Sequence, residues 1–240
     1  MKKLKIMSFN TQHCMNYITR EIDYDSVAAL IKKYSPDVVI LNEMRDAGEH
    51  EGFTDPQTKI LSNLTGMPHY FFAKAIDVYD DRSPYGNGIL SKIPFEKIEV
   101  VHIPDSDPEK RIGTRWYEHR CFVKAKLECG LTVLGVHVGL NPEEKDLAVK
   151  TLIEHIEKEN CILLGDFNMR PEAEELLPIR ERMQDAAELF TEPLLSCPSD
   201  VPKGKIDYIF ATRDIEMISA DIPVEIVSDH RPHIADICIK

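Results

Sequence analysis

Short apolar runs recur along this chain, and several of them end directly in polar residues that can do chemistry. Three such runs, Val38–Leu41, Cys161–Leu164 and Val224–Val227, have the length of a buried or half-buried strand. The segments that follow them are Asn42-Glu43, Gly165-Asp166-Phe167-Asn168 and Ser228-Asp229-His230. Because α/β proteins build their sites just beyond strand ends, we expect these distant segments to meet at one site.

Strand-like runs occupy both halves of the chain, with helical patterns between them. Predicted helices cover residues 23–34, 57–64, 143–157 and 172–177. Predicted strands cover residues 3–10, 38–42, 69–73, 88–91, 95–102, 120–128, 131–138, 161–164, 206–211, 214–220 and 234–239. A polar loop is expected over residues 45–56. This order of elements predicts an α/β protein, a four-layer sandwich in which two packed mixed β-sheets are flanked by helices.

Length and composition favour one domain over residues 1–240. A chain of 240 residues that is 43% hydrophobic can bury a large core, and no low-complexity linker or internal repeat divides it. It has no apolar window of about 18 residues and no secretory-signal pattern. Its six cysteines show no C-x-x-C spacing, which indicates buried, reduced thiols. We expect a cytoplasmic protein with no stable membrane association.

The formal net charge of −12 bears on the partners of this chain. Proteins that bind long nucleic acids usually carry a basic stripe, and the basic clusters here are limited to Lys2-Lys3-Lys5 and Lys32-Lys33. A small substrate is therefore favoured over a long duplex. Nucleic acid stays possible, since a bound cation can invert the local field. The sequence indicates no particular protein partner.

The polar residues at predicted strand ends form a recognisable set. In chain order they are Asn10, Glu43, His137, Asp166, Asn168, Asp207, Asp229 and His230. The segments around them, together with Gly86-Asn87-Gly88, resemble the motifs of the endonuclease/exonuclease/phosphatase superfamily, which has the DNase I-like fold. Each motif alone is a weak signal, but seven of them occur in the family's order over nearly the whole chain.

The resemblance implies hydrolysis of a phosphoester by in-line attack of water, with Mg²⁺ or Mn²⁺ as the cofactor. Glu43 is the expected metal ligand, with Asn10 beside it and Asp229 on the metal side, because Mg²⁺ prefers hard oxygen ligands. Without the other motifs, Glu43 reads as a solvated carboxylate at a strand end, and Asn10 as a turn-forming amide.

The resemblance also implies the catalytic roles. Asp166 orients or deprotonates the attacking water, and Asn168 hydrogen-bonds the phosphoryl group. His230 contacts the phosphate, either as a base or as a charge stabiliser, and is held by Asp207. His137 assists the leaving group or binds a phosphate oxygen. Read alone, Asp166 and Asn168 could form an Asx turn, and His137 could be a satisfied core histidine.

One match and one departure narrow the choice of branch within the superfamily. His137 groups the chain with DNase I, sphingomyelinases, inositol polyphosphate phosphatases and deadenylases, and disfavours the abasic-site endonucleases. The segment Pro202-Lys203-Gly204-Lys205-Ile206-Asp207-Tyr208 lacks the pattern of inositol 5-phosphatases.

Further residues are candidates for substrate binding. The loop over 105–119 is too long for a hairpin turn and carries the only tryptophan of the chain between arginines, a combination that suits a phosphate and a ring. The same loop could equally be a polar excursion. The substrate-binding candidates are His13, Tyr85, Asn87, Arg111, Arg115, Trp116 and Arg120.

The sequence thus favours a metal-dependent phosphodiesterase or phosphatase that acts on a small phosphorylated substrate. One alternative is a metal-dependent endo- or exonuclease. Another, from a different class, is a binding protein that kept this fold and lost catalysis. Such a protein would be expected to lose the metal-binding glutamate or the histidine, and this chain keeps both Glu43 and His230.

Overall fold

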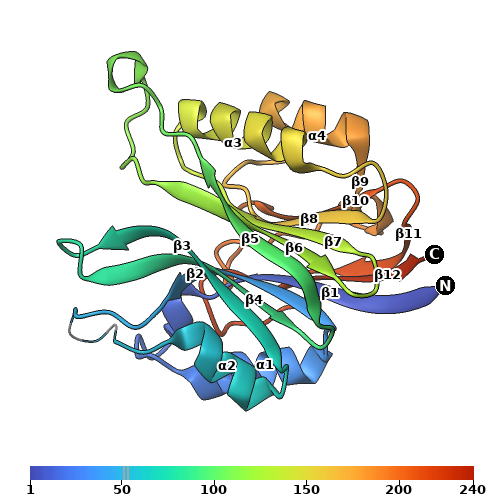
Figure 1. Ribbon diagram of the computed structural model, residues 1–240, viewed down its shortest axis with the longest axis horizontal. Helices are drawn as coiled ribbons and strands as arrows, with labels where there is room; N and C mark the ends of the chain where they lie inside the picture. Colours follow the sequence, from blue (N-terminus) through green and yellow to red (C-terminus); the bar gives the residue numbers. More distant parts are fainter. Residues whose placement is uncertain (51, 53) are drawn as a thin grey trace.

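Two six-stranded mixed sheets pack face to face, and helices cover their outer faces (Figure 1). The computed structural model describes residues 1–50, 52 and 54–240. The first sheet has the order β11-β12-β1-β2-β4-β3, and the second has the order β5-β6-β7-β8-β10-β9. The predicted four-layer α/β sandwich is confirmed.

The first sheet carries both chain ends and two helices on its outer face. Its strands are β1 (Lys2–Asn10), β2 (Val38–Arg45), β3 (His69–Val78), β4 (Ser83–Ser91), β11 (Glu216–Asp221) and β12 (His233–Ile239). Its helices are α1 (Tyr24–Tyr34) and α2 (Gln57–Thr65). In α1, the side chain of Asp23 caps the first turn by accepting a hydrogen bond from the backbone N–H of Ser26.

The second sheet also contains both parallel and antiparallel strand pairs. Its strands are β5 (Phe95–Ile103), β6 (Arg120–Leu127), β7 (Thr132–His137), β8 (Cys161–Asp166), β9 (Met183–Asp185) and β10 (Asp207–Thr212). Its helices are α3 (Pro142–His155) and α4 (Leu177–Arg182). Short 3₁₀ turns occur at Gln12–Cys14, Pro108–Lys110, Glu174–Leu176 and Ala186–Leu189.

An apolar core lies between the two sheets. Ile6 and Ile40 from the first sheet and Val133 and Leu164 from the second belong to one buried cluster. The sheets approach so closely that a Cβ atom on Gly135 of β7 would lie 2.3 Å from the Cδ1 of Ile40. This contact draws the ends of β1 and β2 toward the ends of β7 and β8, where the predicted catalytic residues lie.

Three sequence predictions about elements need correction. The run Val224–Val227 forms no strand: Val224 is 70% exposed, and Pro223 beside it cannot donate to a sheet. The helix predicted over 172–177 is a 3₁₀ turn followed by α4, which has Pro178 in its first turn. β9, which spans only three residues, was not predicted.

The strands β2, β3 and β4 extend well beyond their predicted ends. Part of the loop predicted over 45–56, residues 51 and 53, lies outside the described residues. In the described part of the chain, no helix has both the length and the apolar character needed to cross a membrane.

Candidate active site

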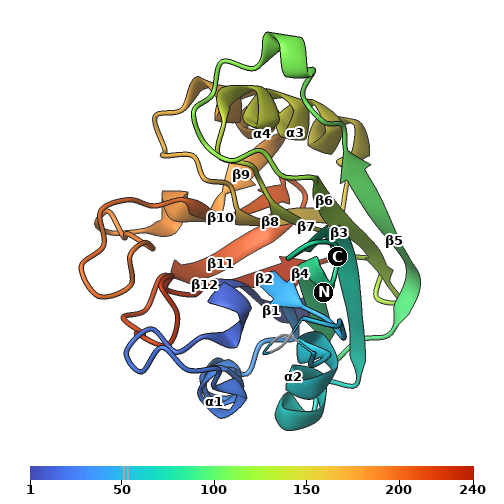
Figure 2. The ribbon, with the colours of Figure 1, turned by 90° about the vertical axis from the view of Figure 1, so that its left-hand side faces the viewer.

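Polar side chains from both sheets converge on the carboxylate of Asp166, at the edge of the sandwich that faces the viewer in Figure 2. Its Oδ2 accepts a hydrogen bond from Asn10 Nδ2 at 3.0 Å. The same oxygen lies 3.5 Å from Nε2 of His137 and 3.7 Å from Nε2 of His230. Three residues that are far apart in the sequence therefore surround one buried oxygen atom of Asp166.

The pairing of β7 with β8 sets the position of Asp166. These strands are parallel neighbours, with Val136 opposite Gly165 and His137 opposite Asp166. Gly165 has a φ of +145°, and a Cβ there would lie 1.8 Å from the carbonyl oxygen of Val136. Only glycine allows this approach, so the Gly-Asp pair of the sequence motif has a backbone cause.

Gly165→Ala is expected to destabilise the fold by about 3 kcal/mol or more, because the added methyl meets backbone and the φ is unfavourable. Gly130→Ala is the matched control: Gly130 also has a positive φ, of +88°, but has open space around it. Urea denaturation of both variants measures the difference. Equal losses of unfolding free energy would show that the close contact with Val136 has no cost.

Backbone and amide groups fix the Asp166 side chain from several sides. Its Oδ1 accepts from the backbone N–H of Asn168 at 2.9 Å, and its own backbone N–H donates to Oδ1 of Asn42 at 3.0 Å. Asn168 adopts a left-handed φ of 52°, which asparagine tolerates better than most residues. Asn42, which belongs to a segment expected at the site but was not among the candidate site residues, further donates to Asn87 Oδ1 and to the carbonyl of Val136.

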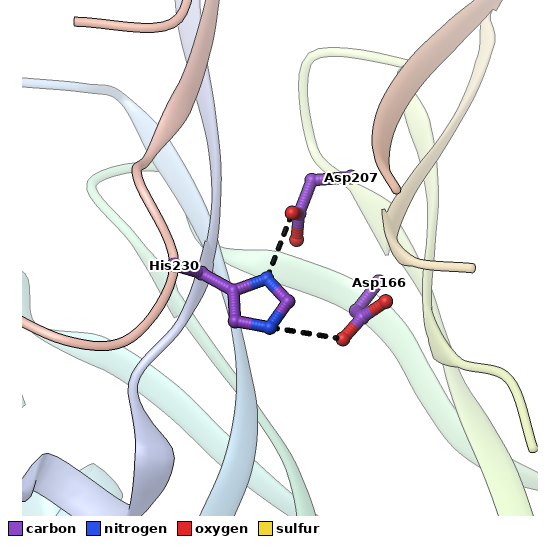
Figure 3. A group of neighbouring side chains, drawn as sticks. All are labelled: Asp166, Asp207 and His230. Atoms are coloured by element: carbon purple, nitrogen blue, oxygen red, sulfur yellow. Dashed lines mark hydrogen bonds and ion pairs between the residues drawn. The ribbon is translucent and has the colours of Figure 1, made fainter. Parts of the chain in front are cut away.

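His230 lies between two buried carboxylates (Figure 3). Its Nδ1 is 2.8 Å from Oδ2 of Asp207, the first residue of β10, which pairs with Asp166 across the sheet. Burial opposes a charge on the ring, but the attraction of Asp207 and Asp166 outweighs it and raises the pKa of His230 well above its usual value. Burial also raises the pKa of Asp166, to about 7, against the opposing effect of His230.

His137 is buried at the end of β7 and contacts a cation. Nη1 of Arg120 lies 3.1 Å from its Nδ1, and Nδ2 of Asn168 lies 3.1 Å from its Nε2. Burial, followed by Arg120 and His230, lowers the pKa of His137 well below its usual value. Glu118 balances the charge of Arg120 through a 2.8 Å contact. Glu118 lies in an irregular loop, and no sequence pattern pointed to it.

A second acidic side chain, Glu43, lies beside Asp166. It sits within β2 and not past its end, at a β-bulge where the pairing of β2 with β4 shifts register. Its φ of 62° is left-handed. Oε1 of Glu43 accepts from the same Asn10 Nδ2 that bonds to Asp166, at 3.0 Å. Burial raises the pKa of Glu43, and the nearby Asp229 raises it further.

The seven substrate-binding candidates fall into two groups. Four lie close to the candidate catalytic groups or support them. His13 has its Nδ1 3.8 Å from Glu43, and burial together with Arg45 lowers its pKa to about 4. Tyr85 packs under the guanidinium of Arg45, and Asn87 is committed to bonds with Asn42 and the carbonyl of Cys121. Arg120 contacts His137, as described above.

The other three candidates do not contact the catalytic groups. Arg111 stacks on the ring of Tyr117 and bonds to Ser106, and Trp116 is 80% exposed. Both line a pocket of about 280 Å³ that Arg120 also borders. Arg115 is not among the residues lining this pocket, and its backbone N–H donates to Asn141. Their roles toward a substrate stay predictions.

Comparison with known proteins identifies the family. A family model described as "Endonuclease/Exonuclease/phosphatase family" matches residues 7–230. No curated protein sequence matches the chain.

Several solved structures share the fold. An endonuclease/exonuclease/phosphatase structure from Beutenbergia cavernae DSM 12333 aligns with a TM-score of 0.81 at 19% identity, over 100% of this chain and 72% of the other. One from Bacteroides vulgatus aligns with a TM-score of 0.75 at 20% identity, over 100% of both chains. A mannosyl-6-phosphatase from Bacteroides thetaiotaomicron VPI-5482 aligns with a TM-score of 0.72 at 13% identity, over 98% of this chain and 100% of the other.

The family model spans the whole converging site, from the strand that ends at Asn10 to His230. Proteins of this family are hydrolases that act on phosphoesters. The chain belongs to the endonuclease/exonuclease/phosphatase family.

Proposed function

We propose that this protein hydrolyses a phosphoester of a small substrate, by in-line attack of water, with Mg²⁺ or Mn²⁺ as its cofactor. The observation that carries the proposal is the convergence of Asn10, His137 and His230 on Oδ2 of Asp166. Phosphoryl transfer depends chiefly on positioning and on stabilising negative charge. This arrangement offers a carboxylate for the water and nitrogen donors for the phosphoryl oxygens.

Asp166 is the group proposed to accept a proton from the attacking water. A general base works best when its pKa lies near the operating pH, and burial raises the pKa of Asp166 to about 7. Its Oδ1 is held by the backbone N–H of Asn168, which leaves Oδ2 as the atom that faces the histidines.

His230 is proposed to stabilise charge and not to act as the base. Asp207 accepts from Nδ1–H, and the raised pKa favours the doubly protonated ring near neutral pH. A protonated imidazole has no free lone pair with which to take a proton. Its Nε2–H is therefore available to a phosphoryl oxygen, next to Asp166.

Glu43, Asp229 and Asn10 would hold the divalent cation, which when bound neutralises charge on the phosphoryl oxygens. The donors fit, because Glu43 and Asp229 supply the hard oxygens that Mg²⁺ prefers. Glu43 is also destabilised as an anion by burial and by Asp229, a situation that a cation relieves. Asn10 is the weaker candidate, since its Oδ1 already accepts from the backbone N–H of Gln12 at 3.1 Å.

The ligand atoms of Asp166, Asp207 and His230 also lie within 4.8 Å of one another. This group is a poorer cation site, because His230 is fixed between the two carboxylates by its own ring nitrogens. A ring protonated on both nitrogens cannot bind a metal ion.

Glu43→Gln is expected to raise the Mg²⁺ concentration that gives half-maximal rate by about tenfold or more, since one anionic ligand is worth at least about 1.4 kcal/mol here. Calorimetric titration of Mg²⁺ into the substrate-free protein measures the same loss independently of activity. Glu49→Gln, which changes an exposed carboxylate further along the chain, is the control. Unchanged metal binding in Glu43→Gln would remove Glu43 from the cation site.

A small substrate is proposed because the chain is strongly acidic and has few basic clusters with which to hold a long phosphate backbone. A nuclease is the second candidate. It is supported by D. rerio TDP2, whose structure in complex with a single-strand DNA product aligns with a TM-score of 0.66 at 17% identity, over 99% of this chain and 100% of the other.

A substrate panel separates these candidates. The purified protein is assayed with p-nitrophenyl phosphate, bis(p-nitrophenyl) phosphate, hexose 6-phosphates and single-stranded DNA, each with and without EDTA. Turnover of the small esters that EDTA abolishes is the expected result. Cleavage of DNA alone would favour the nuclease. Phosphate binding without turnover of any ester would favour the catalytically silent binding protein.

A further inference from the structure

The two ring nitrogens of His137 contact two groups that both act as donors. Nη1 of Arg120 lies 3.1 Å from Nδ1, and Nδ2 of Asn168 lies 3.1 Å from Nε2. A neutral imidazole carries one proton, so one nitrogen accepts and the other donates. Therefore only one of the two contacts can be a hydrogen bond to the ring. The groups around the ring determine which of the two it is.

The contact with Arg120 allows only one protonation state of His137 Nδ1. A guanidinium has five N–H donors and no acceptor, so Nδ1 must be unprotonated to face it. Arg120 is held in place by its 2.8 Å contact with Glu118 and is buried. The single ring proton is then on Nε2. Protonation of both nitrogens is opposed by burial and by the adjacent positive charge, which lower the pKa of His137.

The orientation of the Asn168 amide is also fixed by its contacts. Turning its amide would place Oδ1 next to the His137 proton, which would suit the ring. It would also place that oxygen against the carbonyl oxygen of Val138, which accepts from Nδ2 at 2.9 Å. The backbone N–H of Asn168 is committed to Asp166 Oδ1 at 2.9 Å, so the residue cannot swing away. Nδ2 therefore stays beside Nε2.

Two N–H groups thus lie side by side with no acceptor shared between them. The carboxylate Oδ2 of Asp166 is 3.5 Å from Nε2, longer than the roughly 2.7–3.2 Å of an N–H···O hydrogen bond. The Nε2–H of His137 is buried with no acceptor at hydrogen-bond distance among the described residues, which is costly, and Nδ2 of Asn168 has a second N–H besides the one donated to Val138. An anionic oxygen placed between these two nitrogens would satisfy both.

We propose that Arg120 is a positioning residue that fixes His137 as a neutral donor through Nε2–H, so that of the two roles that the resemblance leaves open for His137 the ring binds a phosphoryl oxygen, beside Asn168. This inference rests on the proposed function for the identity of the anion. It assigns His137 a role in binding the phosphoryl group, and excludes the ring as a group that takes up or releases a proton during the reaction. Arg120 acts through His137 and by this assignment does not touch the reacting atoms.

The tautomer is tested without any activity assay. Long-range ¹H–¹⁵N correlation spectra of the ¹⁵N-labelled protein distinguish protonated from unprotonated imidazole nitrogens, and the spectrum of His137→Gln identifies the signals of this ring. We expect Nε2 in the protonated range and Nδ1 in the unprotonated range. A proton on Nδ1, alone or together with one on Nε2, would overturn the proposal.

The role of Arg120 needs a variant that leaves no buried charge unpaired. Arg120→Met combined with Glu118→Gln removes the donor and its counter-charge together, whereas Glu118→Gln alone keeps the donor. We expect a measurable population of the Nδ1–H tautomer in the double variant and none in the single one. A ring that keeps the proton on Nε2 in both variants would show that Arg120 does not fix it.

Inorganic phosphate probes the anion site directly. Its addition should shift the Nε2–H proton signal of His137 in the wild-type protein and in Glu118→Gln. The shift should be lost in Asn168→Leu if that amide shares the bound oxygen. Saturating phosphate that leaves the Nε2–H signal unmoved would overturn the binding role, whether or not the protein hydrolyses esters.

Kinetics separate a donor from a proton-transfer group. Gln keeps an N–H donor near the position of Nε2, and Leu does not. A hydrogen bond to a charged group is worth roughly 1.5–3 kcal/mol, so His137→Leu should lower kcat by roughly 10- to 150-fold and His137→Gln by clearly less. The pH profile of His137→Gln should keep both limbs of the wild type. Equal losses in both variants, with one limb missing, would make His137 a proton-transfer group.

Discussion

Asp166→Ala is expected to lower the rate of phosphoester hydrolysis by about 10³-fold or more, because a positioned acid or base alone contributes about 10²- to 10⁴-fold to the rate. The variant also removes Oδ2 of Asp166, the oxygen on which the site is centred and one of the two acceptors of Asn10 Nδ2. The loss should fall on kcat more than on KM, because the water is activated in the transition state and not in the ground state.

The control for this variant is Asp214→Ala. Asp214 accepts a hydrogen bond from the backbone N–H of Asn160, at the opposite end of β10 from Asp207, and has no contact with the catalytic groups. Like Asp166→Ala, this variant loses a carboxylate that accepts a backbone hydrogen bond. Thermal unfolding of both proteins, alongside kcat, separates loss of chemistry from loss of fold. Similar kcat values for Asp214→Ala and Asp166→Ala would show that the effect is one of stability.

His230→Gln is expected to have the second large effect, a loss of about 10²- to 10³-fold in kcat. This is the size of loss seen when a preorganised charge stabiliser is removed. The ring is the one positive group shown between Asp207 and Asp166 in the described site, so its removal leaves two buried carboxylates facing each other. Breaking a buried ion pair in this way costs about 3–5 kcal/mol of stability, so a lower unfolding temperature should accompany the lost activity.

A double-mutant cycle identifies the unit to which His230 belongs. Asp207→Asn should lower kcat by about 10- to 10²-fold, and the double variant should be no slower than His230→Gln alone, because groups that act as one unit are not additive. Fully additive losses would mean that Asp207 acts on the reaction by a route other than His230.

Much of the fold could be predicted, because its cause is local. The apolar runs of β1, β2, β7, β8 and β10 are buried on both faces, and such strands read as continuous hydrophobic stretches. The order of these runs and helices was sufficient to predict two packed mixed sheets. The prediction failed at Val224–Val227, where the backbone joins no sheet although Val227 packs against the core and its carbonyl accepts from the backbone N–H of Tyr17; Val224 is 70% exposed.

The convergence of the candidate catalytic residues was predicted from the family motifs around them, and the structure shows a backbone cause for part of it. Gly165 precedes Asp166, and glycine is required there by the contact with Val136. Asp207 and Asp166 are opposite each other in the β8–β10 pair, which places His230 within reach of both.

The parts of the site that depend on contacts between loops could not be predicted. Glu118 belongs to no periodic pattern, and only the folded chain brings it to Arg120. The contact of Arg120 with His137 joins β6 to the end of β7, so neither residue indicates the other in sequence. Trp116, whose residue type suggested binding, is exposed and lines the pocket next to Arg120, so its role in binding stays a prediction.

The most direct test of a metal-dependent phosphoester site centred on Asp166 is one assay on two proteins. Wild type and Asp166→Ala are stripped with EDTA and then titrated with Mg²⁺ or Mn²⁺ while the hydrolysis of bis(p-nitrophenyl) phosphate is followed. We expect no wild-type turnover after EDTA, full recovery with either cation, and a variant that stays about 10³-fold slower at every cation concentration. Turnover that survives EDTA, or that is equal in the two proteins, would contradict this assignment.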